Sequence, residues 1–175
     1  MTYAADMGNP TTRAWLATVL FTGAGLLSLW LVAPWNEYLL PHVLFYAVLT
    51  LNSFFSIRLY ASIQPKRIEQ SALDTALVLV YLALAFSIGR PEFFALFALI
   101  VFITATPKYA YMLGHIPHGP LLRRKILIDI SGIAFCAAVF AGTMAGMPLL
   151  FAWVLAIGFA VANIYHLIIH PMYRL

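Results

Sequence analysis

Long uncharged stretches alternate with short charged ones along the chain. No Asp, Glu, Lys or Arg occurs in residues 14–36, 38–57, 75–89, 93–107 and 130–173. A transmembrane helix needs about 20 predominantly apolar residues to cross the hydrocarbon of a bilayer. Residues 14–36 and 38–57 each fit one span, and 75–89 and 93–107, with 15 uncharged residues each, reach the length of a span with their flanking residues. The last is long enough for two spans if the chain turns at 143–148, where Gly146 and Pro148 are typical of a turn.

The pattern predicts an all-α integral membrane protein with six transmembrane helices. We expect these helices at 13–33, 39–62, 71–89, 92–113, 126–143 and 147–170. Residues 1–12 would form a cytoplasmic N-terminal segment, and residues 13–175 a single transmembrane domain. An even number of spans places both termini on the same side of the membrane.

Positive charge gathers on one side of the predicted spans. Of the ten Lys and Arg residues, only Arg90 falls on the side opposite to the N-terminus. Lys and Arg are enriched in the cytoplasmic loops of membrane proteins, so both termini are predicted to be cytoplasmic. We expect the membrane to be the bacterial cytoplasmic one. Tyr109 and Tyr111 are expected at its inner interface, where amphipathic rings are enriched.

Composition supports a membrane protein and excludes some other classes. Of the 175 residues, 63% are hydrophobic and 9% are charged, whereas a soluble domain is roughly half apolar and about a quarter charged. The surplus of apolar residues must face lipid, because a chain this short leaves much of its surface exposed. The net charge is +4, but the basic residues form short clusters that suit anionic headgroups rather than nucleic acid. The single cysteine, Cys136, excludes a disulfide within the chain.

Similar segments recur along the sequence. One constant offset aligns Lys66-Arg67 with Arg123-Arg124 and also aligns Pro91 with Pro148. The recurring unit is a helical hairpin with basic residues, a span, a short outer turn with proline and a second span. Three such hairpins running the same way would make a parallel repeat. Shared membrane composition is the alternative explanation of these identities.

The hairpin layout is similar to that of a known family. Three hairpins and the start Arg13-Ala14-Trp15 resemble the HdeD-like family of small bacterial membrane proteins. The resemblance implies a fold of three hairpins and nothing about individual residues. The helices of this chain lack the many glycines typical of that family.

Several ionisable groups fall within the predicted spans, where charge is costly and often functional. The candidates for a polar cavity are Asn52, Arg58, Lys108 and Asn163, and the candidates for catalysis are Asp74, Asp129 and His166. In one interpretation, Arg58 and Lys108 reach the headgroups and the two aspartates pair with them. In the other, these groups line a partly hydrated cavity that opens to the cytoplasm. Both interpretations place the aspartates in the bundle interior, because a carboxylate facing lipid alone is costly.

Histidines provide weak candidates for a metal site. His115, His118, His166 and His170 would lie on one face of the membrane, and the last two have the i, i+4 spacing that presents two imidazoles to one ion. No HExxH pattern and no cysteine pair accompanies them. Axial ligation of a haem and a purely interfacial role remain as alternatives, so no cofactor is assigned.

Two classes of function fit the sequence. The absence of GxxxxGK[ST] and GxSxG patterns argues against nucleotide hydrolysis and against a common acyl hydrolase. The first class is a small transporter or channel protomer, or an integral subunit of a larger membrane complex. The second is a small enzyme acting on a lipid or isoprenoid at the cytoplasmic leaflet, with Asp74, Asp129 and His166 as acid–base groups. Six thin helices enclose little volume, so homo-oligomers or other membrane subunits are expected partners besides the bilayer.

Overall fold

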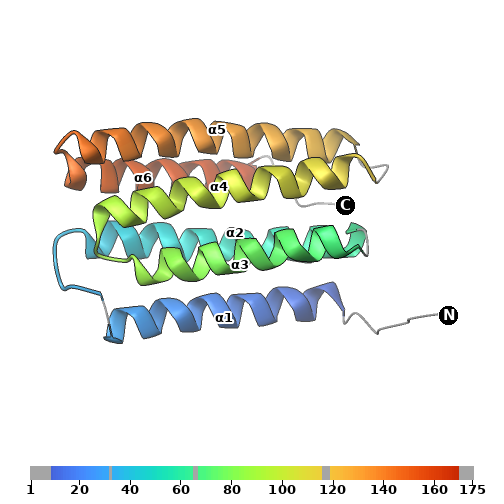
Figure 1. Cartoon of the computed structure of the whole chain (residues 1–175), viewed down its shortest axis with the longest axis horizontal. Helices are drawn as coiled ribbons and strands as arrows, with labels where there is room; N and C mark the ends of the chain where they lie inside the picture. Colours follow the sequence, from blue (N-terminus) through green and yellow to red (C-terminus); the bar gives the residue numbers. More distant parts are fainter. Residues whose placement is uncertain (1–8, 32, 65–66, 116–118, 170–175) are drawn as a thin grey trace.

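Six long helices make up the structure (Figure 1). The computed structural model describes residues 9–31, 33–64, 67–115 and 119–169. Within these ranges the helices are α1 (Pro10–Leu31), α2 (Leu39–Ile63), α3 (Ile68–Phe86), α4 (Pro91–Leu113), α5 (Gly119–Met144) and α6 (Pro148–Ile164), the last continued by a π-helical turn, η1 (Tyr165–Ile169). All six are long and apolar enough to cross a membrane. The predicted all-α architecture with six spans is therefore confirmed, whereas the side on which the termini lie stays a prediction.

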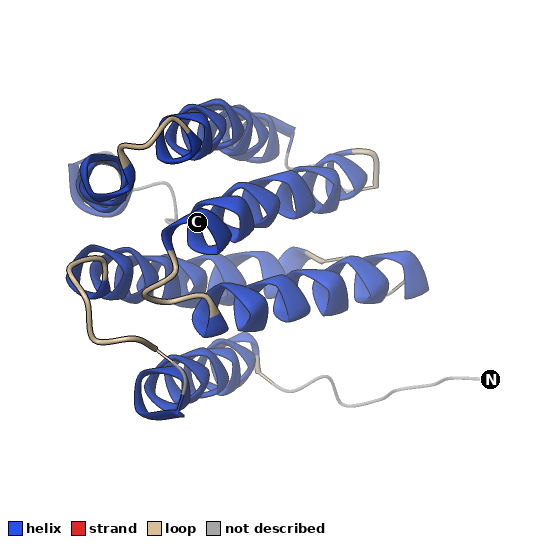
Figure 2. Cartoon of the chain, turned by 60° about the vertical axis from the view of Figure 1, so that its left-hand side comes forward, coloured by secondary structure: helices blue, strands red, loops and turns tan. Residues whose placement is uncertain are grey.

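Successive helices run antiparallel, so the chain turns alternately at the two ends of the bundle (Figures 1 and 2). Helix α1 packs on α2 and α3, α2 packs on α6, α3 on α4, and α5 on α4 and α6. We call the end where α1 begins and α4 ends the basic end, because Arg13, Arg67, Lys108 and Arg124 lie near it. The opposite end carries the turns between α3 and α4 and between α5 and α6.

Large apolar side chains cover the outside of the bundle. Leu16 is 67% exposed, Leu79 61%, Leu127 65% and Val161 60%, and these residues lie on four different helices. Leaving so much apolar surface in water would be unfavourable. Such an exterior is suited to lipid, in agreement with the lengths of the spans.

Helices α1 and α5 begin earlier than the hydrophobic pattern predicts. Helix α1 starts at Pro10 rather than at position 13, because the Asn9 side chain accepts a hydrogen bond from the Thr11 amide at 3.0 Å. Asparagine before a proline is a strong start signal for a helix. Helix α5 starts at Gly119 rather than at 126, with Pro120 in its first turn. The basic run 123–125 is therefore helical and not a loop.

Helix α3 is shifted by three residues toward the N-terminus, and the last helix differs from the prediction at its end. Helix α3 covers 68–86 instead of 71–89, because the turn around Ser87 ends it early. The Ser87 hydroxyl donates to the Leu84 carbonyl at 2.7 Å. The expected last helix, 147–170, is an α-helix only to Ile164 and then a π-helical turn to Ile169. Position 170 lies outside the described residues.

A cluster of buried phenylalanines fills the bundle from the opposite end to its middle. Phe45 of α2 contacts Phe94 of α4 and Phe159 of α6, with ring centroids 5.6 Å and 4.6 Å apart. Phe102 of α4 meets Phe159 at 6.0 Å in an edge-to-face arrangement, which aromatic rings favour. We call these residues the aromatic cluster. It joins α2, α4 and α6 in a dry core.

The turn between α3 and α4 is fixed by side chains from the turn between α1 and α2 and from the start of α2. The Gly89 amide donates to His42 Nδ1 at 3.0 Å, and the Asn36 side chain donates to the Gly89 carbonyl at 2.9 Å. Because His42 Nδ1 accepts, the proton of the neutral ring lies on Nε2. The His42 ring stacks on Phe94 with centroids 3.9 Å apart. This histidine therefore ties the first hairpin to the second.

Gly89 is expected to tolerate alanine less well than Gly146 does. Both have a positive φ, +82° and +90° respectively, a region that costs an L-residue about 1–2 kcal/mol. A Cβ at position 89 would also lie 2.8 Å from Pro34 Cδ, whereas nothing lies within 4 Å of one at position 146. Gly89→Ala should therefore lose about 1–3 kcal/mol more than Gly146→Ala, measured by thermal unfolding in mild detergent. Equal losses would contradict the described contact with Pro34.

The predicted orientation can be tested with fusions. Green fluorescent protein at the C-terminus should fluoresce, because it folds in the cytoplasm, and alkaline phosphatase there should be inactive. Alkaline phosphatase fused after Arg90, in the turn between α3 and α4, should be active as the matched control. Active phosphatase at the C-terminus would overturn the orientation derived from the basic residues.

Candidate functional site

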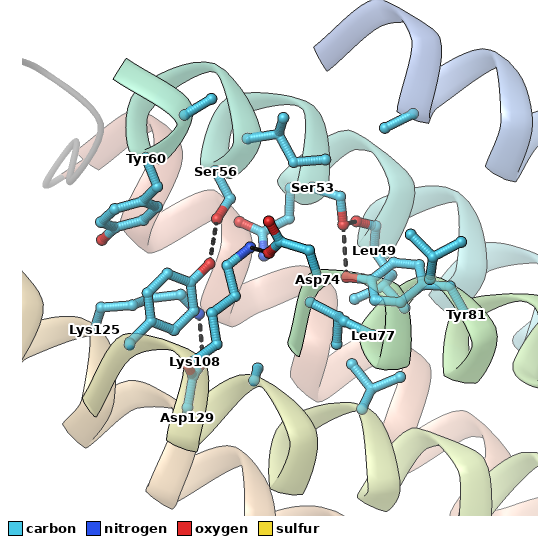
Figure 3. Close-up of a pocket in the computed structure, with 18 of the residues that line it drawn as sticks. Leu49, Ser53, Ser56, Tyr60, Asp74, Leu77, Tyr81, Lys108, Lys125 and Asp129 are labelled. Carbon is cyan, nitrogen blue, oxygen red and sulfur yellow. Dashed lines mark hydrogen bonds and ion pairs between the residues drawn. The ribbon is translucent and has the colours of Figure 1, made fainter. Parts of the chain in front are cut away.

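A cavity of about 190 Å³ lies in the half of the bundle nearer to the basic end (Figure 3). It extends from Arg13 and Gln64 at the basic end to Phe21, Leu49 and Phe102 in the middle of the bundle. Its polar lining comes from five helices and consists of Arg13, Asn52, Ser53, Ser56, Tyr60, Gln64, Asp74, Tyr81, Lys108, Tyr109, Lys125 and Asp129. Phe102 is shared with the aromatic cluster, which forms the inner limit of the cavity.

Ion pairs of opposite charge line the cavity. Lys108 Nζ lies 2.7 Å from Asp74 Oδ1 and joins α4 to α3. The other oxygen of Asp74 accepts a hydrogen bond from Gln64 at the end of α2. Lys125 pairs with Asp129 one turn further along α5, and both side chains are almost fully buried. Each charge is thus compensated, as buried charges must be.

Tyr109 lies between the two lysines. Its ring centroid is 5.6 Å from Lys108 Nζ and 4.9 Å from Lys125 Nζ, within the range of cation–π attraction. The Tyr109 and Ser56 hydroxyls share a hydrogen bond of 2.8 Å. Tyr109 on α4 therefore contacts α5 through the ammonium group of Lys125, and α2 through the hydrogen bond between its own hydroxyl and that of Ser56.

A second pair of hydroxyls lies deeper in the cavity (Figure 3). The Ser53 hydroxyl donates to the Leu49 carbonyl at 2.8 Å. A hydroxyl has one proton to donate, so the Tyr81 hydroxyl is the donor in its 2.6 Å bond to Ser53. This bond ties α3 to α2 where the polar lining gives way to the aromatic cluster.

Asp129 has one carboxylate oxygen that lacks a described partner. Its Oδ1 accepts from Lys125, while Oδ2 is buried without a hydrogen-bond partner in the part of the chain that the structure describes. A buried acceptor of this kind is costly and usually has a partner. Oδ2 has almost no accessible surface, so a bound molecule would reach it only after the side chains around Asp129 move.

The structure brings together some of the residues that the sequence singled out. Asp74, Asp129, Lys108 and Asn52 all line the cavity. Arg58 does not, because it is exposed on the outside of α2. Between the two cationic partners expected for Asp74, the structure selects Lys108.

Asn163 and His166 lie elsewhere. Both line a separate groove between α5 and α6, and the Asn163 side chain donates to the Phe159 carbonyl at 2.8 Å. His166, proposed as an acid–base partner of the aspartates, does not line the cavity that holds them. The three candidate catalytic residues are thus divided between two sites.

The predicted metal site stays a prediction. His115 is exposed at the end of α4, with Nδ1 2.8 Å from the Tyr111 carbonyl. His118 and His170 lie outside the described residues. Among the residues that are described, no three His, Cys, Asp or Glu side chains gather as metal ligands would.

The sequence pattern missed Lys125 and the buried contacts of Tyr109. Lys125 was expected in a loop, and the early start of α5 brings it into register with Asp129. Their i, i+4 spacing was a usable signal. Tyr109 was expected at the membrane interface, but only 4% of it is exposed, against the two lysines. A tyrosine near the end of a helix can face either the headgroups or the bundle interior, and the sequence does not show which until the inward face of the helix is known.

No protein-family model, no curated protein and no solved structure matches this chain. The resemblance to the HdeD-like family is therefore limited to the layout of the hairpins and supports no functional inference.

Asp74 and Lys108 are expected to be energetically coupled. Lys108→Met or Asp74→Asn alone leaves a charge in the cavity wall without its partner and should cost about 1–3 kcal/mol. The double variant should recover about 1 kcal/mol or more of the summed loss. Thermal unfolding in detergent measures this cycle, and Arg58→Met on the exposed face of α2 is the control for loss of a basic side chain. Strict additivity would mean that the pair does not stabilise the fold.

Proposed function

We propose that this polytopic membrane protein is a protomer of a small transporter, whose charged cavity binds a small charged or zwitterionic solute. The observation that carries the proposal is the position of paired charges in a cavity that ends at the aromatic cluster. Transporters commonly bind their substrate near the middle of the membrane and open to one side at a time. We propose that the side open here is the cytoplasmic one.

A channel fits the geometry less well. A conducting pore needs a continuous path lined by polar groups or water. Beyond Phe102 the described interior holds Phe45, Phe94 and Phe159, and a small pocket near His42 leaves no room for a water molecule. Passage of a solute would therefore require the aromatic cluster to rearrange, as alternating access demands.

The ion pairs provide a means of coupling binding to movement. A solute carrying a carboxylate or an ammonium group competes with Asp74 for Lys108, or with Lys108 for Asp74. Since this ion pair joins α3 to α4, its exchange alters the contact between the two helices of the second hairpin. A ligand shifts a conformational equilibrium only by the difference in its affinity for the two states. Exchange of this ion pair supplies such a difference.

Size limits the solute. Pockets for drug-sized ligands have volumes of about 300–1,000 Å³, whereas this cavity measures about 190 Å³. The mixture of lysines, aspartates and tyrosine hydroxyls favours a molecule with few heavy atoms and at least one charge.

The three residues that the enzyme hypothesis needs for acid–base catalysis do not line one site. It requires Asp74, Asp129 and His166 around one substrate, and His166 lines the groove instead. A subunit role in a larger complex is the other alternative, and it predicts a static cavity with no solute of its own.

Thiol labelling distinguishes these hypotheses. In a Cys136→Ala background, which removes the buried native thiol, Ala61→Cys places a thiol in the cavity wall. Ala95→Cys places one within the aromatic cluster near the opposite end, at a buried position. A membrane-impermeant thiol reagent should label position 61 from the basic side. It should label position 95 slowly from the opposite side, as the transporter opens outward.

Protection experiments would then identify the solute. Amino acids, small carboxylates and small amines are added one class at a time, and the transported class should slow labelling of position 61. Asp74→Asn should remove this protection. Leu79→Cys, on the lipid-facing side of α3, is the control that no solute should protect. Absence of labelling at position 95, together with absence of protection at position 61, would contradict a transporter.

A further inference from the structure

A second hollow lies between the basic-end halves of α5 and α6, with a volume of about 440 Å³. Its floor is formed by Asn52 of α2 and Phe102 of α4. Its walls include Arg124, Ile128 and Phe135 of α5 and Phe159, Ala162 and His166 at the end of the chain's last helix. We call this hollow the α5–α6 groove. The transport proposal does not use it.

Glycines fix where the groove begins. Close to the opposite end, the ring of Phe151 packs on Gly142 so tightly that a Cβ there would lie 2.1 Å from it. Phe135 packs in the same way on Gly158, with 2.6 Å to a Cβ. The groove begins at the second of these contacts, since Phe135 and Gly158 both line it, and it extends from there toward the basic end. On that side α6 ends in the π-helical turn that carries His166, a distortion often found at functional sites.

Polarity changes along the groove. Its deep part is lined by Phe102, Phe135 and Phe159, and its end near the headgroup region by Arg124, Asn163 and His166. No Asp or Glu is among the described residues that line it. A molecule with an apolar chain and an anionic head would therefore meet complementary chemistry along its whole length.

We propose that the α5–α6 groove binds an anionic phospholipid of the adjacent leaflet. One acyl chain lies against Phe135 and Phe159, and the phosphate meets the guanidinium of Arg124, which is exposed at the groove's rim. Arginine binds phosphate through paired, charge-assisted hydrogen bonds. A soluble phosphate would occupy only the polar end of the groove and leave its apolar walls without contacts. A lipid fills the polar end with its headgroup and the apolar part with its acyl chain.

Native mass spectrometry of the full chain in mild detergent tests this proposal. Phosphatidylglycerol should be retained better than phosphatidylcholine with the same acyl chains. Arg124→Gln should reduce phosphatidylglycerol retention about fivefold, because a basic residue near an anionic surface contributes about 1 kcal/mol. Arg123→Gln is the matched control, since Arg123 is an equally exposed neighbour on α5 that does not line the groove. It should leave retention unchanged.

A second pair of variants tests whether the apolar part of the groove holds the acyl chain. Ala162→Phe should fill the groove and reduce lipid retention, while Val161→Phe, at an exposed position outside the groove, should not.

Equal effects of the two arginine variants, or equal retention of the two lipids, would overturn the proposal. Displacement of the lipid by millimolar glycerol 3-phosphate would also overturn it, because the site would then recognise a free anion. Labelling of Ala61→Cys is unaffected by these outcomes, so failure here is distinguishable from failure of the transport proposal.

Discussion

The cost of placing a charge in hydrocarbon governs the half of the bundle near the basic end. An ammonium or carboxylate there must find a partner, because water is scarce and the dielectric is low. Lys108 meets this requirement across two helices with Asp74, and Lys125 meets it within α5 with Asp129. The first pair holds the second hairpin together, and Tyr109 links both pairs to α2. The cavity is the space enclosed by these constraints.

The other half of the bundle obeys the opposite rule and excludes charge. There the aromatic cluster packs rings from three helices, and the backbone groups of the turn at Gly89 are satisfied by His42 and Asn36. The protein is therefore polar inside at one end and dry at the other. This asymmetry gives the cavity one inner limit, and in the proposed transporter a solute would enter from the basic end without crossing the membrane. If the protein transports a solute as proposed, the phenylalanines of the aromatic cluster would have to rearrange for the solute to pass.

Hydrophobic pattern predicted the six spans because span length is set by the bilayer and not by tertiary packing. It also placed Asp74 and Asp129 inside the bundle, since an isolated carboxylate cannot face lipid. The sequence left open whether Arg58 or Lys108 is the partner of Asp74. The choice depends on which face of α2 points inward, and a helix that is apolar all round gives little sign of this in its hydrophobic periodicity. Lys125 was lost for a different reason. A basic run resembles a loop, and the Gly119-Pro120 start that makes it helical is a weak signal beside three consecutive charges.

Lys125 connects the two hollows of the molecule. Its side chain lines both the charged cavity and the α5–α6 groove, as do Asn52 and Phe102. The ammonium group is paired with one oxygen of Asp129, and the second oxygen of that carboxylate is buried without a hydrogen-bond partner among the described residues. A phosphate in the groove would attract the same ammonium and weaken its hold on Asp129. The affinity of Asp129 for a proton or for a cationic group in the cavity would then rise. Through Lys125, binding at one site would change the affinity of the other, and such coupling is reciprocal. A lipid in the groove would therefore change the affinity of the cavity for its solute.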